Sequence, residues 1–277
     1  MGIPMIVQKV LKDYINLFNE HLPDTIEGLY IHGSIALNAY VDDSSDIDFI
    51  ALTNRRLTEE DSEALSYIHK TIANKYKKPD MDGVYAVRED MGKLNNAGKY
   101  PYYNDGELLF GDYFNFNPIT WWILKSKGIK FFGPEIQDFR IDIKPHQLSS
   151  YVLGNMNTYW ANRIQMAETS IDHLVKMPTV EIDFEIEWTV LGLLRQFYTI
   201  KEYDIVSKLE AGEYGLTQLP VEWHDIIKEA MNLREGVKGG IYSSEMERLE
   251  RTLRFSKFLI DHCNNSVENG IEFVEHR

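Results

Sequence analysis

Two stretches of sequence decide the fold: Gly28-Leu29-Tyr30-Ile31-His32-Gly33-Ser34 and, after an interval, Ser45-Asp46-Ile47-Asp48-Phe49-Ile50-Ala51-Leu52. Each piece contains a short apolar run that is typical of a buried strand. Side chains alternate between the two faces of a strand, so Asp46 and Asp48 point the same way while Ile47 points into the core. The sequence therefore predicts two carboxylates on one face of a strand that follows a Gly-Ser turn.

This pair of carboxylates is suited to binding Mg²⁺. They would lie roughly 6–7 Å apart along the strand, and Mg²⁺ is usually held by one or two carboxylates together with substrate phosphates. Gly33 allows close backbone approach and Ser34 supplies a hydroxyl, which suits a triphosphate. Either motif alone is more often structural than catalytic. Their occurrence on two consecutive predicted strands favours a magnesium-dependent nucleotide site.

The rest of the chain predicts an α+β protein with two domains. Apolar spacing predicts a helix over residues 5–21, another from Thr58 to about Tyr76, and a strand over 81–87. Residues 95–117 are rich in Gly, Asn, Pro and Tyr, and we expect a long ordered loop there. After Pro145 the periodicity is helical throughout. We expect a small mixed sheet flanked by helices in residues 1–145, and an all-α helical bundle in residues 146–277.

The charge and composition narrow the possible partners. The chain has 29 basic and 43 acidic residues and a formal net charge of −14, which argues against a nucleic-acid partner. The charge is compatible with a cationic substrate, although acidity also simply keeps proteins soluble. Cys263 is the only cysteine, which fits a cytoplasmic protein. No apolar run approaches the roughly 18 residues of a membrane span, so we expect no membrane partner.

The arrangement Gly33-Ser34, eleven residues, Asp46-Ile47-Asp48 resembles the signature of the DNA polymerase β-like nucleotidyltransferase superfamily. Further motifs follow the order seen in the aminoglycoside 3″- and 9-adenylyltransferases, which act on streptomycin and spectinomycin. The likeness extends from about residue 28 to residue 236. The motifs are Tyr100-Pro101, Phe110-Gly111-Asp112-Tyr113, Phe131-Phe132-Gly133-Pro134 and Leu219-Pro220.

The resemblance implies roles in the first half of the chain. Asp46 and Asp48 would bind Mg²⁺, and Gly33-Ser34 would contact the triphosphate of ATP. A third acidic residue, Asp82, would complete the metal site and serve as the catalytic base, with Asp80 as the alternative. Tyr113 stands where streptomycin-modifying members carry a Trp against the drug; simple packing is the alternative.

In the second half, the resemblance assigns Lys208 to the ATP phosphates and Glu181 and Glu185 to the acceptor. The alternatives are a solvated lysine and a solvated acidic run, because acidic residues alternate from 181 to 187. Departures from the family pattern put the streptomycin site in doubt. They are Asp82 for Glu, Tyr113 for Trp, Lys176 for Trp and Arg234 for Tyr.

The expected activity is magnesium-dependent transfer of AMP from ATP to a hydroxyl of an aminoglycoside or aminocyclitol antibiotic, with release of pyrophosphate. Two alternatives are a nucleotidyltransferase that modifies a protein, an RNA or another small molecule, and an inactive ATP-binding relative. The family reading also implies a monomer whose ATP and cationic acceptor are contacted by both domains.

Overall fold

A mixed six-stranded sheet organises the first half of the chain. The computed structural model describes residues 2–42, 44–94, 98–237 and 240–268. The chain divides into two units, Met1–Ile143 and Lys144–Arg277. The strands of the first unit run in the order β5-β4-β3-β2-β1-β6. Their bounds are β1 Ile26–Ile31, β2 Ile47–Thr53, β3 Met81–Val87, β4 Tyr100–Asn104, β5 Glu107–Gly111 and β6 Ile129–Phe132.

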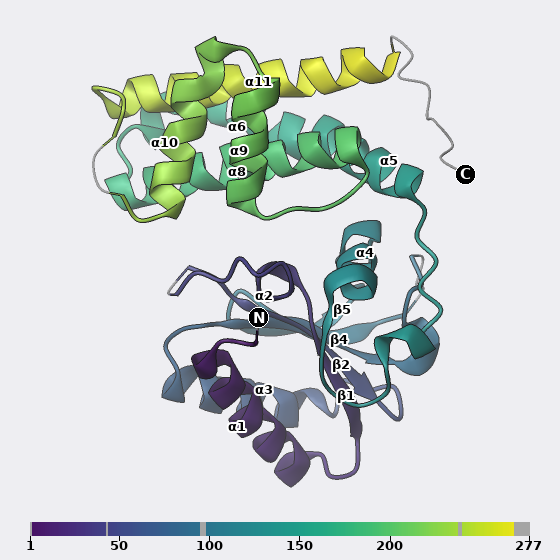
Figure 1. The fold of residues 1–277 in the computed structure, drawn as a ribbon. Helices are drawn as coiled ribbons and strands as arrows, with labels where there is room; N and C mark the ends of the chain where they lie inside the picture. Colours follow the sequence, from purple (N-terminus) through teal and green to yellow (C-terminus); the bar gives the residue numbers. More distant parts are fainter. Residues whose placement is uncertain (1, 43, 95–97, 238–239, 269–277) are drawn as a thin grey trace. The chain divides into compact units, whose positions relative to one another are not determined.

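Strands β2 and β3 are parallel, and every other neighbouring pair is antiparallel. Helices α1 (Met5–His21) and α3 (Ser62–Lys75) lie together against one face of the sheet, where their apolar stripes join the main core (Figure 1). Four shorter elements complete the unit. They are α2 (Gly33–Ala36), α4 (Pro118–Lys127) and the 3₁₀ turns Arg88–Asp90 and Ile136–Asp138.

The prediction of a long loop over residues 95–117 is wrong for most of that range. Residues 95–97 lie outside the described residues, but Tyr100–Asn104 and Glu107–Gly111 form the antiparallel hairpin β4–β5. Asp105 and Gly106 make its turn with positive φ angles of 50° and 79°. An Asp-Gly pair between apolar residues is a strong hairpin signal. The many Gly, Asn and Pro residues around it obscured that signal.

The second unit is helical, so the predicted α+β class is confirmed. Helix α8 is central and contacts α5, α9, α10 and α11 (Figure 1). In the described part of the chain, no helix has both the length and the apolar composition to span a bilayer. The elements are α5 Pro145–Asn155, a π-helical turn Met156–Trp160, α6 Ala161–Thr169, α7 Ile171–Leu174, α8 Thr179–Glu202, α9 Lys208–Gln218, a 3₁₀ turn Val221–Trp223, α10 His224–Arg234 and α11 Glu245–Glu268.

A chain of buried hydrogen bonds ties α1, α3 and β3 together beneath the sheet. The Tyr14 hydroxyl donates to the Tyr85 hydroxyl at 2.7 Å, and the Tyr85 hydroxyl lies 2.7 Å from Nε2 of His69. All three side chains are buried, and the His69 ring stacks on Tyr103 with 3.8 Å between centroids. Because a buried polar atom without a partner is costly, this chain fixes how both helices dock.

We expect Tyr85→Phe to destabilise the protein, because it leaves the Tyr14 hydroxyl and the His69 nitrogen without their shared partner. The free energy of unfolding should fall by about 1–3 kcal/mol, measured by urea denaturation. Tyr67→Phe is the matched control, since Tyr67 is 54% exposed, and its effect should stay within about 0.5 kcal/mol. Equal effects of the two substitutions would contradict the structural role of the network.

Stability should also fall as the pH is lowered from 7 to 5. Burial lowers the pKa of His69 to about 3, so the folded protein keeps this ring neutral while the unfolded chain takes up a proton below its ordinary value. The stabilisation that comes from keeping the His69 ring neutral is complete above the ordinary pKa of histidine and is lost progressively below it. By pH 5 the loss from His69 should reach about 2 kcal/mol, measured by urea denaturation at several pH values. A His69→Gln variant with an unchanged pH slope would contradict this assignment.

Candidate active site

The register of β2 with β3 places Asp48 directly beside Asp82. The strands are parallel and their Cα partners run from Ile47↔Met81 to Thr53↔Val87, with Asp48 opposite Asp82. Both carboxylates are half-buried, and their strand neighbours Phe49 and Met81 are buried in the core. Because side chains alternate along each strand, the two carboxylates leave the sheet on the face opposite the main core.

Asp46 and Asp80 lie just before these strands. Asp46 is exposed and precedes β2 by one residue, whereas sequence reasoning had placed it on the strand itself. The backbone carbonyl of Asp80 accepts a hydrogen bond of 2.8 Å from the amide of Ile47. The Asp80 side chain is ion-paired with Lys78. Of the two candidates for the third acidic position, Asp82 is therefore the one whose carboxylate lies beside Asp48.

The electrostatics of these carboxylates favour binding of a cation. Burial raises the pKa of Asp82 to about 8, with further contributions from Asp48, Asp46 and Asp105, while a hydrogen bond from the Asp105 backbone amide opposes the shift. The pKa of Asp46 is also raised, mainly by burial and to a smaller extent by the charge of Asp48. Oδ1 of Asp82 is buried and makes no hydrogen bond. A bound divalent cation would compensate both the mutual repulsion and this unsatisfied oxygen.

The carboxylates fit a hard cation that takes oxygen ligands, such as Mg²⁺. Among the described residues, no three His, Cys, Asp or Glu side chains already form a group able to hold a metal ion. Mg²⁺ usually takes only one or two protein carboxylates and fills its remaining positions with water and phosphate oxygens. The pair Asp48 and Asp82 is consistent with that mode of binding.

Gly33 is required where the Gly-Ser turn passes Asp48. Its φ is +59°, and a Cβ placed on it would lie 1.8 Å from Oδ2 of Asp48. The amide of His32 donates a 3.0 Å hydrogen bond to the Asp48 carbonyl, which fixes the turn beside β2. Oγ of Ser34 is buried and has no hydrogen-bond partner. The turn that passes Asp48 therefore contains a buried hydroxyl without a hydrogen-bond partner.

His32 and Tyr113 are packed into the first unit. His32 is 6% exposed, and burial lowers its pKa although Asp48 opposes the shift, so the ring is held neutral. Tyr113 is 9% exposed, with ring centroids 5.3 Å from Tyr102 and 5.0 Å from Phe116. Burial raises its pKa, with smaller contributions from Asp48 and Asp82. Most of the Tyr113 ring is therefore buried by packing within the first unit.

The acidic residues of α8 do not form one solvated run. A helix turns by about 100° per residue, so residues that alternate in sequence face different directions. Of the four acidic residues from 181 to 187, only Glu181 is exposed. The others have partners within the helical unit: Asp183 binds Arg248, Glu185 binds Arg163, and Glu187 is buried against Lys208.

Lys208 is not an ordinary solvated lysine. It begins α9 after the N-cap Ser207, and its Nζ lies 2.9 Å from Oε1 of Glu187. Burial lowers its pKa, against the opposing effect of Glu187. A guanidinium nitrogen of Arg234 lies 3.8 Å from the same carboxylate oxygen. Two cations, Lys208 and Arg234, therefore approach the same buried carboxylate.

Sequence reasoning missed Asp105 and Arg163. Asp105 reaches Asp82 only because the β4–β5 hairpin folds back beside β3. Its signal was the Asp-Gly pair itself. Arg163 lies 22 residues from Glu185 and meets it through the packing of α6 on the bundle. No local sequence pattern marks that contact.

Comparison with known proteins gives a family match within the helical unit and a structural likeness over the whole chain. Residues 162–257 match the family model for the aminoglycoside adenylyltransferase C-terminal domain. Among solved structures, the chain resembles the spectinomycin adenyltransferase AAD(9) from Enterococcus faecialis, determined with ATP and spectinomycin. The TM-score is 0.66 and the identity 16%, over 93% of this chain and 99% of that one.

No curated protein matches the sequence significantly. At 16% identity, the likeness to the solved structure establishes the shared fold, and it extends over both units. The family model supplies the relationship at the level of sequence for the helical unit. The resemblance noted in the motifs is confirmed at the level of sequence for residues 162–257, which match the family model, and at the level of fold for both units, which are similar to the solved spectinomycin adenyltransferase.

Proposed function

We propose that the protein transfers AMP from ATP to a hydroxyl of an aminoglycoside or aminocyclitol antibiotic, of the streptomycin or spectinomycin type, in a magnesium-dependent reaction that releases pyrophosphate. The observation that carries this proposal is the pairing of Asp48 with Asp82 beside Gly33, with one oxygen of Asp82 buried and unsatisfied. The structural relative that contains ATP and spectinomycin supports the choice of nucleotide and acceptor.

In this proposal Asp46 and Asp48 hold Mg²⁺, and Asp82 both contributes to the metal site and acts as the base. The metal, when bound, would supply positive charge to the phosphates of ATP. The Asp82 carboxylate accepts the proton of the acceptor hydroxyl, while the Asp105 amide holds the carboxylate in place. The hydroxyl oxygen forms a bond to the α-phosphorus, and the bond from that phosphorus to the pyrophosphate oxygen breaks.

Gly33 and Ser34 are proposed to contact the triphosphate. The close approach of the turn to Asp48 and the unpartnered Ser34 hydroxyl support this role. For Lys208 we propose a phosphate contact, supported by its place at the start of α9 and by the ion pair with Glu187 that holds its ammonium group in position. Glu181 and Glu185 are proposed to meet the acceptor. Glu185 can do so only while sharing its charge with Arg163.

The proposed acceptor is a small molecule, and the net charge of −14 disfavours RNA. The test is a pyrophosphate-release assay with ATP and Mg²⁺ in the presence of streptomycin, spectinomycin and other aminoglycosides. We expect turnover with at least one of them and none when the metal is chelated. Turnover of ATP that requires a protein or RNA acceptor instead would replace the proposed acceptor.

Asp82→Asn should reduce turnover by about 10²–10⁴-fold, because the amide keeps the size of the side chain but cannot accept the proton. Binding of ATP with Mg²⁺, measured by calorimetry, should change far less. Asp80→Asn is the matched control, since the Asp80 carboxylate is paired with Lys78. A loss of turnover in Asp80→Asn with normal turnover in Asp82→Asn would move the base to Asp80.

Gly33→Ala should abolish binding of ATP with Mg²⁺, because the new Cβ would displace the Asp48 carboxylate. Gly236→Ala is the control: its φ is +72° and its surroundings are open, so it carries similar backbone strain without a clash. Both variants should lose about 1–2 kcal/mol of stability, measured by urea denaturation. If both variants bound the nucleotide normally, the turn would have no role in the site.

A further inference from the structure

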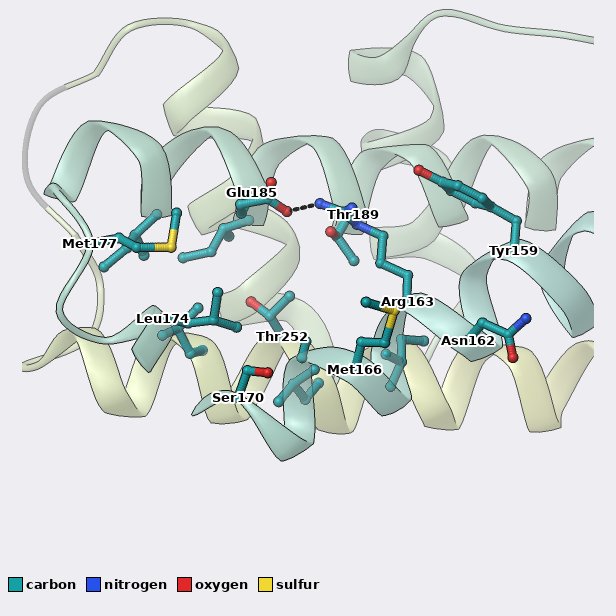
Figure 2. Close-up of a pocket in the computed structure, with 16 residues that line it drawn as sticks. Tyr159, Asn162, Arg163, Met166, Ser170, Leu174, Met177, Glu185, Thr189 and Thr252 are labelled. Carbon is teal, nitrogen blue, oxygen red and sulfur yellow. Dashed lines mark hydrogen bonds and ion pairs between the residues drawn. The ribbon is translucent and has the colours of Figure 1, made fainter. Parts of the chain in front are cut away.

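The helical unit contains a cavity of about 430 Å³ whose apolar lining the proposed function does not use (Figure 2). Its walls come from α6, α7, α8 and α11, so all its lining residues belong to the second unit. Small-molecule sites typically enclose roughly 300–1,000 Å³ and are mostly apolar. The size is therefore that of a ligand site, and it exceeds a simple packing defect.

The body of the cavity is apolar. Ile182 and Ile186 of α8 are buried in its wall, and Leu249 of α11 is also buried there. Leu174 and Met177 lie together toward one end (Figure 2). Methionine is flexible and polarisable, so it adapts to ligands of different shape. These side chains offer a surface for an apolar body and no charge to attract an ionic one.

The other end of the cavity is polar, but its two charged side chains neutralise each other. Arg163 is ion-paired with Glu185, and its guanidinium carbon lies 4.7 Å from the centre of the Trp188 ring. Figure 2 shows this pair above the cavity, with Tyr159 beyond it and the Thr189 hydroxyl close by. An ionic ligand would have to break the pair and be desolvated, which is unfavourable. A neutral hydroxyl could bond to Glu185 or Thr189 without breaking it.

The backbone explains why the cavity is not filled by the protein itself. A π-helical turn, Met156–Trp160, precedes α6 and carries Tyr159. The chain then breaks at Ser170, and α7 contains only four residues before α8 begins. A short helix cannot cover the neighbouring faces of α8 and α11. Single π-helical turns occur frequently at functional sites.

We propose that this cavity binds a neutral small molecule with an apolar body of two or three rings and one hydroxyl group. A cavity of about 150 Å³ holds benzene, so 430 Å³ accommodates a larger ring system. The hydroxyl bonds at the Arg163–Glu185 end, and the rings lie among the aliphatic side chains. An aminoglycoside, being polar and cationic, does not match this lining. Glu185 also stands among the proposed acceptor contacts, but the aliphatic lining of the cavity differs in chemistry from a site for a cationic acceptor.

The probe for the test is 2-naphthol, added to the full chain and followed by fluorescence and calorimetry. We expect saturable binding to one site, at least tenfold tighter than binding of 2-naphthoate, which has the same rings and a negative charge. Ala167→Phe should weaken the binding at least tenfold by filling the cavity, because Ala167 lines it. Gln165→Phe, on the exposed face of the same helix, should leave the binding unchanged.

Met166→Trp is a second variant, for the case that Ala167→Phe does not fold. Met166 lines the cavity but is 69% exposed, so a larger side chain there covers the opening without disturbing the core. Absence of saturable binding would overturn the proposal, as would binding that neither variant reduces. Tighter binding of 2-naphthoate would overturn the neutral class of ligand. Displacement of 2-naphthol by spectinomycin with ATP and Mg²⁺ would assign the cavity to the acceptor site instead.

Discussion

The in-register parallel pairing of β2 and β3 is the constraint on which the candidate active site depends. It holds two carboxylates, Asp48 and Asp82, at the same level of neighbouring strands, where they repel each other. The strands cannot shift to relieve this repulsion. A slip of one residue would move Phe49 and its neighbours out of the core that α1 and α3 form on the other face. Burial of the apolar face thus fixes an arrangement that the polar face alone would disfavour.

The part of the site that could be predicted from the sequence is the part encoded by local periodicity. Alternation along a strand placed Asp48 and Ile47 on opposite faces, and Gly33-Ser34 marked a turn. The missed features depend on contacts between distant segments. Asp105 reaches Asp82 through a hairpin, and Arg248 meets Asp183 from 65 residues away. A single sequence contains no periodic signal for such pairs.

The acidic character of the chain illustrates the same limit. A net charge of −14 is compatible with an acidic, cation-attracting surface, yet three acidic side chains of α8 are neutralised within their own unit. Their partners are Arg248, Arg163 and Lys208. Glu187 is even approached by two cations, Lys208 and Arg234. Net charge therefore says little about what a particular helix face will bind.

The buried charge of Arg248 and the buried polar groups of the candidate active site differ in whether they have partners. In the helical unit, Arg248 is buried among Asp183, Glu229 and Glu245, each within hydrogen-bonding distance, so the group holds three elements together. In the first unit, an oxygen of Asp82 and the hydroxyl of Ser34 are buried without partners. Unsatisfied buried groups cost stability. Their persistence beside Gly33 is explained if a bound cation and phosphate supply the missing partners, and packing alone gives no such reason.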